Sequence, residues 1–182
     1  MSKPKLVGPL NDLLANHAVY YQKLRNYHWN VTGPAFFQLH QKFEEMYLAA
    51  QEHVDSIAER ILALGGHPRS TMRGYLDNAT ISEDAETPDA QTMVKNLTRD
   101  IEALTAHNHK VKAQAGELRD DTTVNLLDAI ADGTFGLMRR HSGGKTYCSP
   151  HCEASFTNCR MIEAPEFVPG PHGDLIAALR YP

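Results

Sequence analysis

Two stretches decide the fold: LNDLLANHAVYYQKLRNYHWNV at residues 10–31 and FFQLHQKFEEMYLAAQEHVDSIAERILAL at residues 36–64. In both, apolar side chains recur every three or four residues, which is typical of a helix that buries one face. Gly33-Pro34 separates them, because proline lacks a backbone donor and disfavours helix in the residue before it. Gly65-Gly66 is a strong stop for the second. The sequence therefore predicts two long helices, about Leu10–Val31 and Phe36–Leu64, joined by a short turn.

Helical periodicity returns after a mixed, acidic segment. A third long helix is expected from about Pro88, a residue suited to a first turn, to Glu117, and a fourth from Thr122-Thr123. Thr71–Leu76 is expected to form a short helix in the middle connection, and Asn11 or Asp12 to cap the first helix. The main body has no strand-like alternation. We therefore expect an all-α fold, an antiparallel four-helix bundle with a short helix in its middle connection.

The pattern of the fourth helix weakens toward its end. Gly133 and Gly136 are expected to interrupt it, and Gly143-Gly144 to end it. Beyond that point prolines, glycines and all three cysteines gather, and helical period is lost. The predicted organisation is a bundle at residues 1–141 and an irregular Cys/Pro-rich tail at 142–182.

Three interpretations of this tail stay open. Thiolate and imidazole are the usual zinc ligands, and Cys148, His151, Cys152 and Cys159 supply them, although their spacing is not that of standard paired knuckles. A plain alternative is a poorly ordered extension with free thiols. A third is that the sequence after about Asp132 is not a natural continuation, for instance through a shifted reading frame.

Composition excludes several function classes. The chain has 182 residues and a net charge of −4, so no overall basic field attracts nucleic acid. No apolar run approaches the roughly 20 residues that a membrane span needs. Met1–Pro9 lacks the apolar core of a signal peptide, and three late cysteines make no disulfide framework for the main fold. We expect a cytoplasmic protein without a membrane partner.

Four residues of metal-binding types lie in the two long helices. His28 and His40 flank the Gly33-Pro34 break, while Asp55 and Glu59 are one helical turn apart on the second helix and share a face. Within that helix His40 and Asp55 are fifteen residues apart, roughly 22 Å at the helical rise. One ion cannot touch both from the same helix. Either the chain has two unrelated half-sites, or the histidines of one subunit meet the carboxylates of another.

A structural interpretation of the same residues competes with the metal one. Asp55 and Glu59 could be a solvated face with Arg60 and Lys42 as their partners. On this view His28 is a hydrogen-bonded core histidine and binds no ion.

Three motifs resemble the Dps family, the DNA-protecting mini-ferritins of starved cells. They are NYHWNVTG at residues 26–33, FFQLH at 36–40 and DSIAERILALGGHP at 55–68, and the similarity in organisation extends over about Leu6–Asp128. The resemblance implies a ferritin-like subunit in a hollow homo-oligomer, a dodecamer, with ferroxidase centres at its two-fold interfaces.

Residue roles follow from this resemblance. It implies that His28 and His40 bind iron from one subunit and that Asp55 and Glu59 bind it from the neighbour, with Glu59 bridging. Glu44, one turn after His40, is a weaker candidate ligand. The implied reaction is oxidation of Fe(II) to Fe(III), preferably by hydrogen peroxide, with storage of the ferric product and protection against oxidative stress. Iron is the implied metal, and zinc competes for the same ligands.

We also state expectations for two residues that neighbour these candidate ligands. Trp29 is expected beside the centre, as a plain core aromatic in preference to a radical scavenger. His53, two residues before Asp55, is expected to lie behind the ligands or on the surface.

The sequence departs from the family at the expected three-fold pore. The family has an acidic residue in a Thr-x-Asp-Leu-Leu pattern, and here Asn125 takes that position between Thr123 and Leu127. A neutral amide attracts Fe(II) less strongly. One or more of four nearby acids is expected to compensate: Asp120, Asp121, Asp128 or Asp132.

Two other functions remain as alternatives. A nucleoid-associated protein needs clustered cations, yet the N-terminus offers only Lys3 and Lys5. The basic residues of the C-terminal part are scattered among acids, so we expect weak or absent DNA binding; they are Arg139, Arg140, Lys145, Arg160 and Arg180. The third class is an inactive shell whose site holds zinc.

Overall fold

The computed structural model describes the backbone of residues 3–139 and the side chains of residues 5–134. The contacts reported below all lie within the compact unit Met1–Thr134. The predicted boundary at 141/142 and the cysteine-bearing tail fall outside the described residues.

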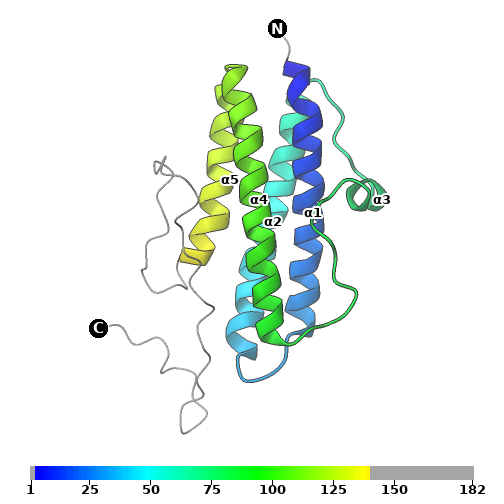
Figure 1. The fold of residues 1–182 in the computed structure, drawn as a ribbon, viewed down its shortest axis with the longest axis vertical. Coiled ribbons are helices and arrows are strands. Elements are labelled where there is room, and N and C mark those ends of the chain that lie inside the picture. Colours follow the sequence, from blue (N-terminus) through cyan, green and yellow to red (C-terminus); the bar gives the residue numbers. More distant parts are fainter. Residues whose placement is uncertain (1–2, 140–182) are drawn as a thin grey trace, which may run out of the picture. The chain divides into compact units, whose positions relative to one another are not determined.

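Every described element is helical. In order they are a short 3-10 helix, Lys3–Leu6, then α1 (Val7–Asn30), α2 (Phe36–Ala63), α3 (Met72–Leu76), α4 (Ala90–Glu117) and α5 (Asp121–Arg139). The predicted all-α bundle with a short helix in its middle connection is confirmed. Two antiparallel pairs, α1 with α2 and α4 with α5, stand side by side, and the segment carrying α3 runs back along the bundle so that α2 and α4 are parallel (Figure 1). None of the described helices is long and apolar enough to cross a membrane.

The apolar stripes of the four long helices meet in one core. Its buried members include Leu10 and Leu14 of α1, Ile57 and Ile61 of α2, and further side chains of α4 and α5: Val111, Ala115, Leu127 and Ile130. Each fully buried leucine or isoleucine contributes about 1.5–3 kcal/mol relative to exposure. The core therefore holds the α1–α2 pair against the α4–α5 pair.

The predicted cap of the first helix is wrong. α1 begins at Val7, and its N-cap residue, Leu6, makes no side-chain cap bond. Asn11 instead donates to the His67 carbonyl (3.0 Å) and accepts from the Arg69 amide (2.7 Å), while Asp12 pairs with the Arg69 guanidinium (2.9 Å). These polar side chains hold the segment after α2 against α1, which explains why cap-forming residues lie inside a helix.

The other helix ends follow local chemistry. Gly65 has a φ of +77°, and the Gly66 amide donates to the Ile61 carbonyl at 3.0 Å, so the predicted glycine stop of α2 is confirmed. Asp89 caps α4 by accepting from the Thr92 amide at 3.0 Å. Pro88 therefore precedes the helix and does not occupy its first turn.

The predicted interruption of the fourth long helix is also wrong, because α5 continues through Gly133 and Gly136 to Arg139. A Cβ at Gly133 would lie 3.0 Å from Nε2 of His53. The glycine is thus explained by close packing across the bundle, and it costs the helix about 1 kcal/mol against alanine.

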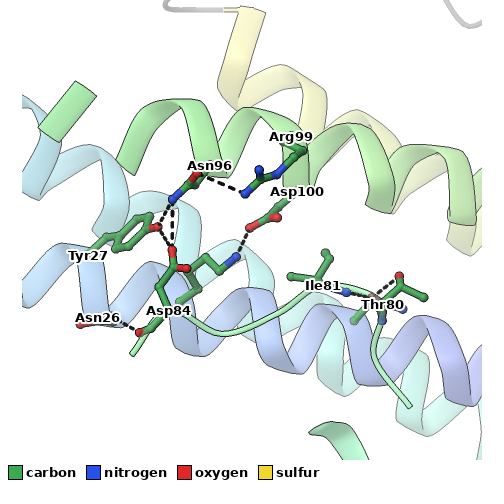
Figure 2. Close-up of polar contacts among 10 residues, drawn as sticks. Asn26, Tyr27, Thr80, Ile81, Asp84, Asn96, Arg99 and Asp100 are labelled. Atoms are coloured by element: carbon green, nitrogen blue, oxygen red, sulfur yellow. Dashed lines mark hydrogen bonds and ion pairs between the residues drawn. The ribbon is translucent and has the colours of Figure 1, made fainter. Parts of the chain in front are cut away.

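The connection between α2 and α4 is tied to α1. The side-chain oxygen of Asn16 accepts from the Thr80 amide (2.9 Å), the Thr80 hydroxyl (3.0 Å) and the Ile81 amide (2.9 Å), and both loop residues appear in Figure 2. Asn16 is almost fully buried. The Asn16 side chain of α1 therefore fixes the middle of the long connection between α2 and α4.

Candidate metal centre

The end of α1 and the start of α2 bring two predicted ligands into contact. The rings of His28 and His40 stack, with centroids 3.8 Å apart and planes 23° apart. His28 is buried and His40 half-buried. The short turn after Asn30 creates this pair, because it folds α2 back beside the last turn of α1.

Reciprocal hydrogen bonds define the chemistry of the pair. Nδ1 of His28 donates to the His40 carbonyl, and Nδ1 of His40 donates to the His28 carbonyl, each at 2.8 Å. A carbonyl oxygen can only accept, so each Nδ1 carries the hydrogen and each Nε2 keeps its lone pair. Metal-binding histidines characteristically donate their other N–H to such a carbonyl, which fixes both tautomer and orientation. The pair is thus arranged to offer two Nε2 atoms to a cation.

Aromatic neighbours hold the two rings in place. Tyr47 meets His28 edge-on at 5.3 Å, and Phe36 stacks on His40 at 5.0 Å. Sequence reasoning assigned neither a role in the site. Their spacing of one or two turns from His40 on α2 was the available signal, since residues four and seven apart share a helix face.

A polar network fixes the residue before His28. The Tyr27 hydroxyl donates to the Asp84 carboxylate and accepts from the Asn96 side-chain amide at 3.0 Å, as Figure 2 shows. The Asn26 amide group donates to the Asp84 carbonyl at 3.0 Å. Burial raises the pKa of the Tyr27 hydroxyl, and its bond to Asp84 raises it further. The last turn of α1 is therefore anchored to both the connection and α4.

One turn earlier, a buried ion pair joins the same helices. Nζ of Lys23 lies 2.6 Å from the Asp100 carboxylate, and both side chains are almost fully buried (Figure 2). Burial raises the pKa of Asp100, an effect that the Lys23 ammonium opposes. Loss of either partner would leave an unpaired buried charge, which is strongly destabilising.

The predicted carboxylate ligands are presented differently. Asp55 and Glu59 are exposed on α2 and make no hydrogen bond or ion pair with any described residue. The alternative that Lys42 and Arg60 neutralise them is wrong: Lys42 binds Glu45 at 3.1 Å, and Arg60 binds Asp120 at 2.7 Å. Two unpaired carboxylates one turn apart are free to take a cation.

Glu44 is exposed as well, and its carboxylate accepts from the Tyr47 hydroxyl at 3.4 Å. This contact places Glu44 beside a ring that itself touches His28. Its prediction as a further ligand stays a prediction.

Among the side chains that the structure describes, residues 5–134, no three histidine, cysteine, aspartate or glutamate residues gather closely enough to hold one ion. A single subunit thus offers a histidine pair and a separate carboxylate pair. This result agrees with the roughly 22 Å separation along α2 that the helical rise gives.

Two expectations about neighbouring residues are wrong. Trp29 is 57% exposed, with the Arg25 guanidinium 4.7 Å from its ring centroid, so it is not a core aromatic within the subunit. His53 is neither on the surface nor behind the ligands. Its ring lies edge-on to the buried His17, 5.4 Å away, on the inner side of the bundle.

Two of the four acids expected to compensate for Asn125 are already engaged. Asp120 is bound by Arg60 and Thr123, which lower its pKa although burial acts to raise it, and Asp128 is bound by Lys112. Asp121 and Asp132 are exposed, as is Asn125 itself. Of the four acids, Asp121 and Asp132 are therefore the ones left without a bound partner among the described residues.

Comparison with known proteins places the chain among ferritin-like proteins. A family model for the ferritin-like domain matches residues 8–133. The DNA protection during starvation protein of Brevibacillus brevis is 43% identical over 124 residues, covering 68% of this chain and 83% of that protein.

Solved structures agree in both fold and family. A Dps protein from Vibrio cholerae, described as a member of a broad superfamily of ferritin-like diiron-carboxylate proteins, superposes with a TM-score of 0.73 at 36% identity, covering 76% of this chain and 87% of that one. A Dps protein from Bacillus brevis gives 0.73 at 38% identity, covering 76% and 93%.

Proposed function

The chain belongs to the Dps family of ferritin-like proteins, and on that premise we propose that it is an iron-sequestering ferroxidase that protects against oxidative stress. Proteins of this family generally store iron and protect against oxidative stress. The finer proposal is that Fe(II) is oxidised at centres shared between subunits, preferably by hydrogen peroxide, and kept as ferric iron inside a hollow oligomer.

The observation that carries the proposal is the division of the ligand set. His28 and His40 turn their lone-pair nitrogens outward from a fixed pair, while Asp55 and Glu59 stand unpaired elsewhere on α2. Each half offers only two protein ligands, and the histidine half supplies no negative charge to balance a divalent cation. A second copy of the chain related by a two-fold axis would complete both halves at once, because such an interface is reciprocal.

In this arrangement each group has a distinct task. The two Nε2 atoms bind Fe(II), and the partner's carboxylates neutralise and bridge the ions, with Glu59 in the bridging position and Glu44 as an additional ligand. Hydrogen peroxide accepts two electrons, one from each of two Fe(II) ions, and with two protons yields two water molecules. Pairing the ions limits one-electron release of hydroxyl radical.

Assembly and iron entry extend the proposal. We infer a dodecameric shell with these centres at its two-fold interfaces. Iron would approach past Asn125 of α5, through a field that this neutral residue weakens and that Asp121 and Asp132 of the same helix maintain. Removal of those two acids should therefore slow uptake more than oxidation.

DNA binding is the second candidate, favoured by the name of the Brevibacillus brevis relative. The net charge of −4 and the sparse basic residues argue for weak or absent binding at physiological salt. A gel shift at about 150 mM salt would contradict this if it showed tight duplex binding. A zinc-occupied inactive shell, the third candidate, is distinguished by metal analysis of the purified protein together with its turnover.

The deciding experiment mixes two inactive variants. His28→Ala and Asp55→Ala are each given Fe(II) anaerobically and then hydrogen peroxide, while ferric absorbance and particle mass are followed. Each alone should lose rapid oxidation, and reassembly of the two together should restore part of it, because some interfaces then carry an intact histidine pair facing an intact carboxylate pair. Glu117→Ala, an exposed acid of α4, is the matched control and should behave as wild type. Failure of the mixture to recover, with the particle mass unchanged, would contradict a shared centre.

A further inference from the structure

A second histidine pair lies in the middle of the bundle, away from the candidate metal centre. His17 of α1 is 1% exposed, and neither of its ring nitrogens has a hydrogen-bond partner among the described residues. It lines a small cavity between α1, α4 and α5 that admits a molecule about the size of water. The other lining residues are Leu104, Thr105, Asn108, Ile130, Ala131 and Thr134.

A second unpartnered group faces the same cavity. Asn108 of α4 is 3% exposed, and its side-chain nitrogen donates to the Leu127 carbonyl of α5 at 2.8 Å. This bond fixes the amide, yet its Oδ1 has no partner within the described part of the chain. Buried polar atoms in folded proteins are bonded in about nine cases of ten or more. Two such atoms from different helices lining one cavity indicate a ligand between them.

The lining residues define the chemical class of that ligand. No carboxylate lines the cavity, so a cation bound there would be buried without a counter-charge. Burial lowers the pKa of His17 to about 3, with the charges of His53 and His107 acting in the same direction, so its imidazole is neutral. A neutral imidazole offers one donor and one acceptor, and Asn108 Oδ1 accepts. The site therefore suits an uncharged molecule that both donates and accepts.

The hydroxyl of Thr134 adds a third point of attachment. It donates to the Ile130 carbonyl at 2.9 Å, within its own helix, and keeps lone pairs for an incoming donor. A ligand here would reach α1, α4 and α5 at once.

We propose that one water molecule is bound in this cavity as an integral part of the subunit, bridging a ring nitrogen of His17 to Oδ1 of Asn108. It links α1 to the α4–α5 pair at a place where no direct hydrogen bond between these two side chains does so. This role is independent of iron chemistry.

The first test is a high-resolution crystal structure of the whole assembled protein, with anomalous data collected for first-row metals. The proposal expects a spherical density within hydrogen-bond distance, about 2.7–3.2 Å, of a His17 nitrogen and of Asn108 Oδ1, without anomalous signal. In His17→Phe, which keeps the ring and removes both nitrogens, that density should be gone. Wild-type density that is absent, or that carries a metal's anomalous signal, overturns the proposal.

The second test measures coupling in solution. His17→Phe and Asn108→Leu should each lower the thermal unfolding midpoint, and the double variant should lower it by clearly less than the sum, because the water is lost with the first substitution. The lost bond to Leu127 is common to both backgrounds and cancels. The control cycle pairs Asn108→Leu with His67→Phe, an exposed histidine, and should be additive. Additive shifts in the His17 cycle would contradict a bridging water. Should a variant fail to fold, the wild-type crystal density decides alone.

Discussion

Two pairs of histidine rings lie in contact within this bundle, and they are held in different ways. In the His28–His40 pair each Nδ1 donates to a carbonyl, and the half-buried rings of Tyr47 and Phe36 pack against the two imidazoles. In the His17–His53 pair the His17 ring is buried, and neither of its nitrogens has a partner among the described residues. Gly133 packs closely against the His53 ring. The same residue type thus has its tautomer fixed by carbonyls in one place, where we propose a cation, and is kept neutral by burial in the other.

The contrast shows how a histidine suited to bind a metal ion differs from a core histidine. Orientation by a carbonyl leaves one nitrogen free and basic, which favours metal binding. Burial without a nearby acid disfavours any charge on or beside the ring. Four predictions test this contrast, in decreasing order of the change that each should produce.

The largest effect should come from the proposed ligand pair, His28 and His40. His40→Ala is expected to reduce the initial rate of peroxide-driven Fe(II) oxidation by roughly 100-fold or more, since loss of an outer-shell partner alone commonly costs 10–100-fold. His17→Phe should leave that rate within about twofold of wild type, because its ring does not face the carboxylates; rates are compared per assembled particle. Equal losses of oxidation rate in both variants would contradict the proposal that the His28–His40 pair, and not His17, takes part in iron oxidation.

Lowering the pH should destabilise the fold through the buried His17–His53 pair. Folding lowers the pKa of His17 from 6.5 to about 3, chiefly through burial, so between these values the unfolded chain binds a proton that the folded chain does not. The free energy of unfolding should therefore fall as pH drops below 6.5, by roughly 1.4 kcal/mol per unit, and level off near pH 3. His53 and His107, whose pKa values burial also lowers, add to the same slope.

The charged groups around these rings modulate the slope without reversing it. Glu52 acts on His53, while Asp12 and Lys110 act in opposite senses on His107, and the residues of α5 that line the cavity are uncharged. Urea unfolding followed from pH 7 to 4.5 measures the dependence. His17→Phe should flatten it, and an unchanged slope in that variant would show that His17 is not its source.

The helices themselves could be read from the sequence far better than their contacts. The α2 boundaries were predicted to within one residue, because an unbroken apolar period met a double glycine. The start of α1 was missed, since the partners of Asn11 and Asp12 lie near position 68 and no local pattern reports them. The interruption at Gly133 was predicted from propensity alone, whereas a histidine across the bundle decides that position.

The candidate site, like the fold, could be predicted from the sequence only in part. Spacing showed that His40 and Asp55 cannot share an ion within one helix, and the absence of any three-ligand group among described residues agrees. The reciprocal carbonyl bonds that set the histidine tautomers depend on how two helix ends meet, which the sequence does not encode locally. For the same reason His17, inside an ordinary apolar stripe, gave no sign of its missing partners.

A smaller effect is expected at the anchor of the metal-centre region. Tyr27→Phe removes the hydroxyl shared by Asp84 and Asn96 and should lower the free energy of unfolding by about 1–2 kcal/mol, since a buried hydrogen bond to a charged group is lost. Asn96 still reaches Asp84 at 3.2 Å, which limits the loss. Denaturant titration gives the value. A loss as large as that expected from breaking the buried Lys23–Asp100 pair, about 3–5 kcal/mol, would show that the Tyr27 bonds are the main anchor of the loop.

The smallest effect compares two glycines in long helices. A Cβ at Gly116 of α4 would meet nothing within 4 Å, so Gly116→Ala should raise the free energy of unfolding by about 0.5–1 kcal/mol through helix propensity alone. At Gly133 the same gain is opposed by His53, whose Nε2 would lie 3.0 Å from the new carbon and whose ring is backed by His17. Because packed rings yield little, overpacking costing about 1–3 kcal/mol should exceed the gain, and Gly133→Ala should be net destabilising by about 1 kcal/mol. Unfolding of both variants under one condition gives the sign directly, and a stabilising Gly133→Ala would mean that the His17–His53 pair yields to the added carbon.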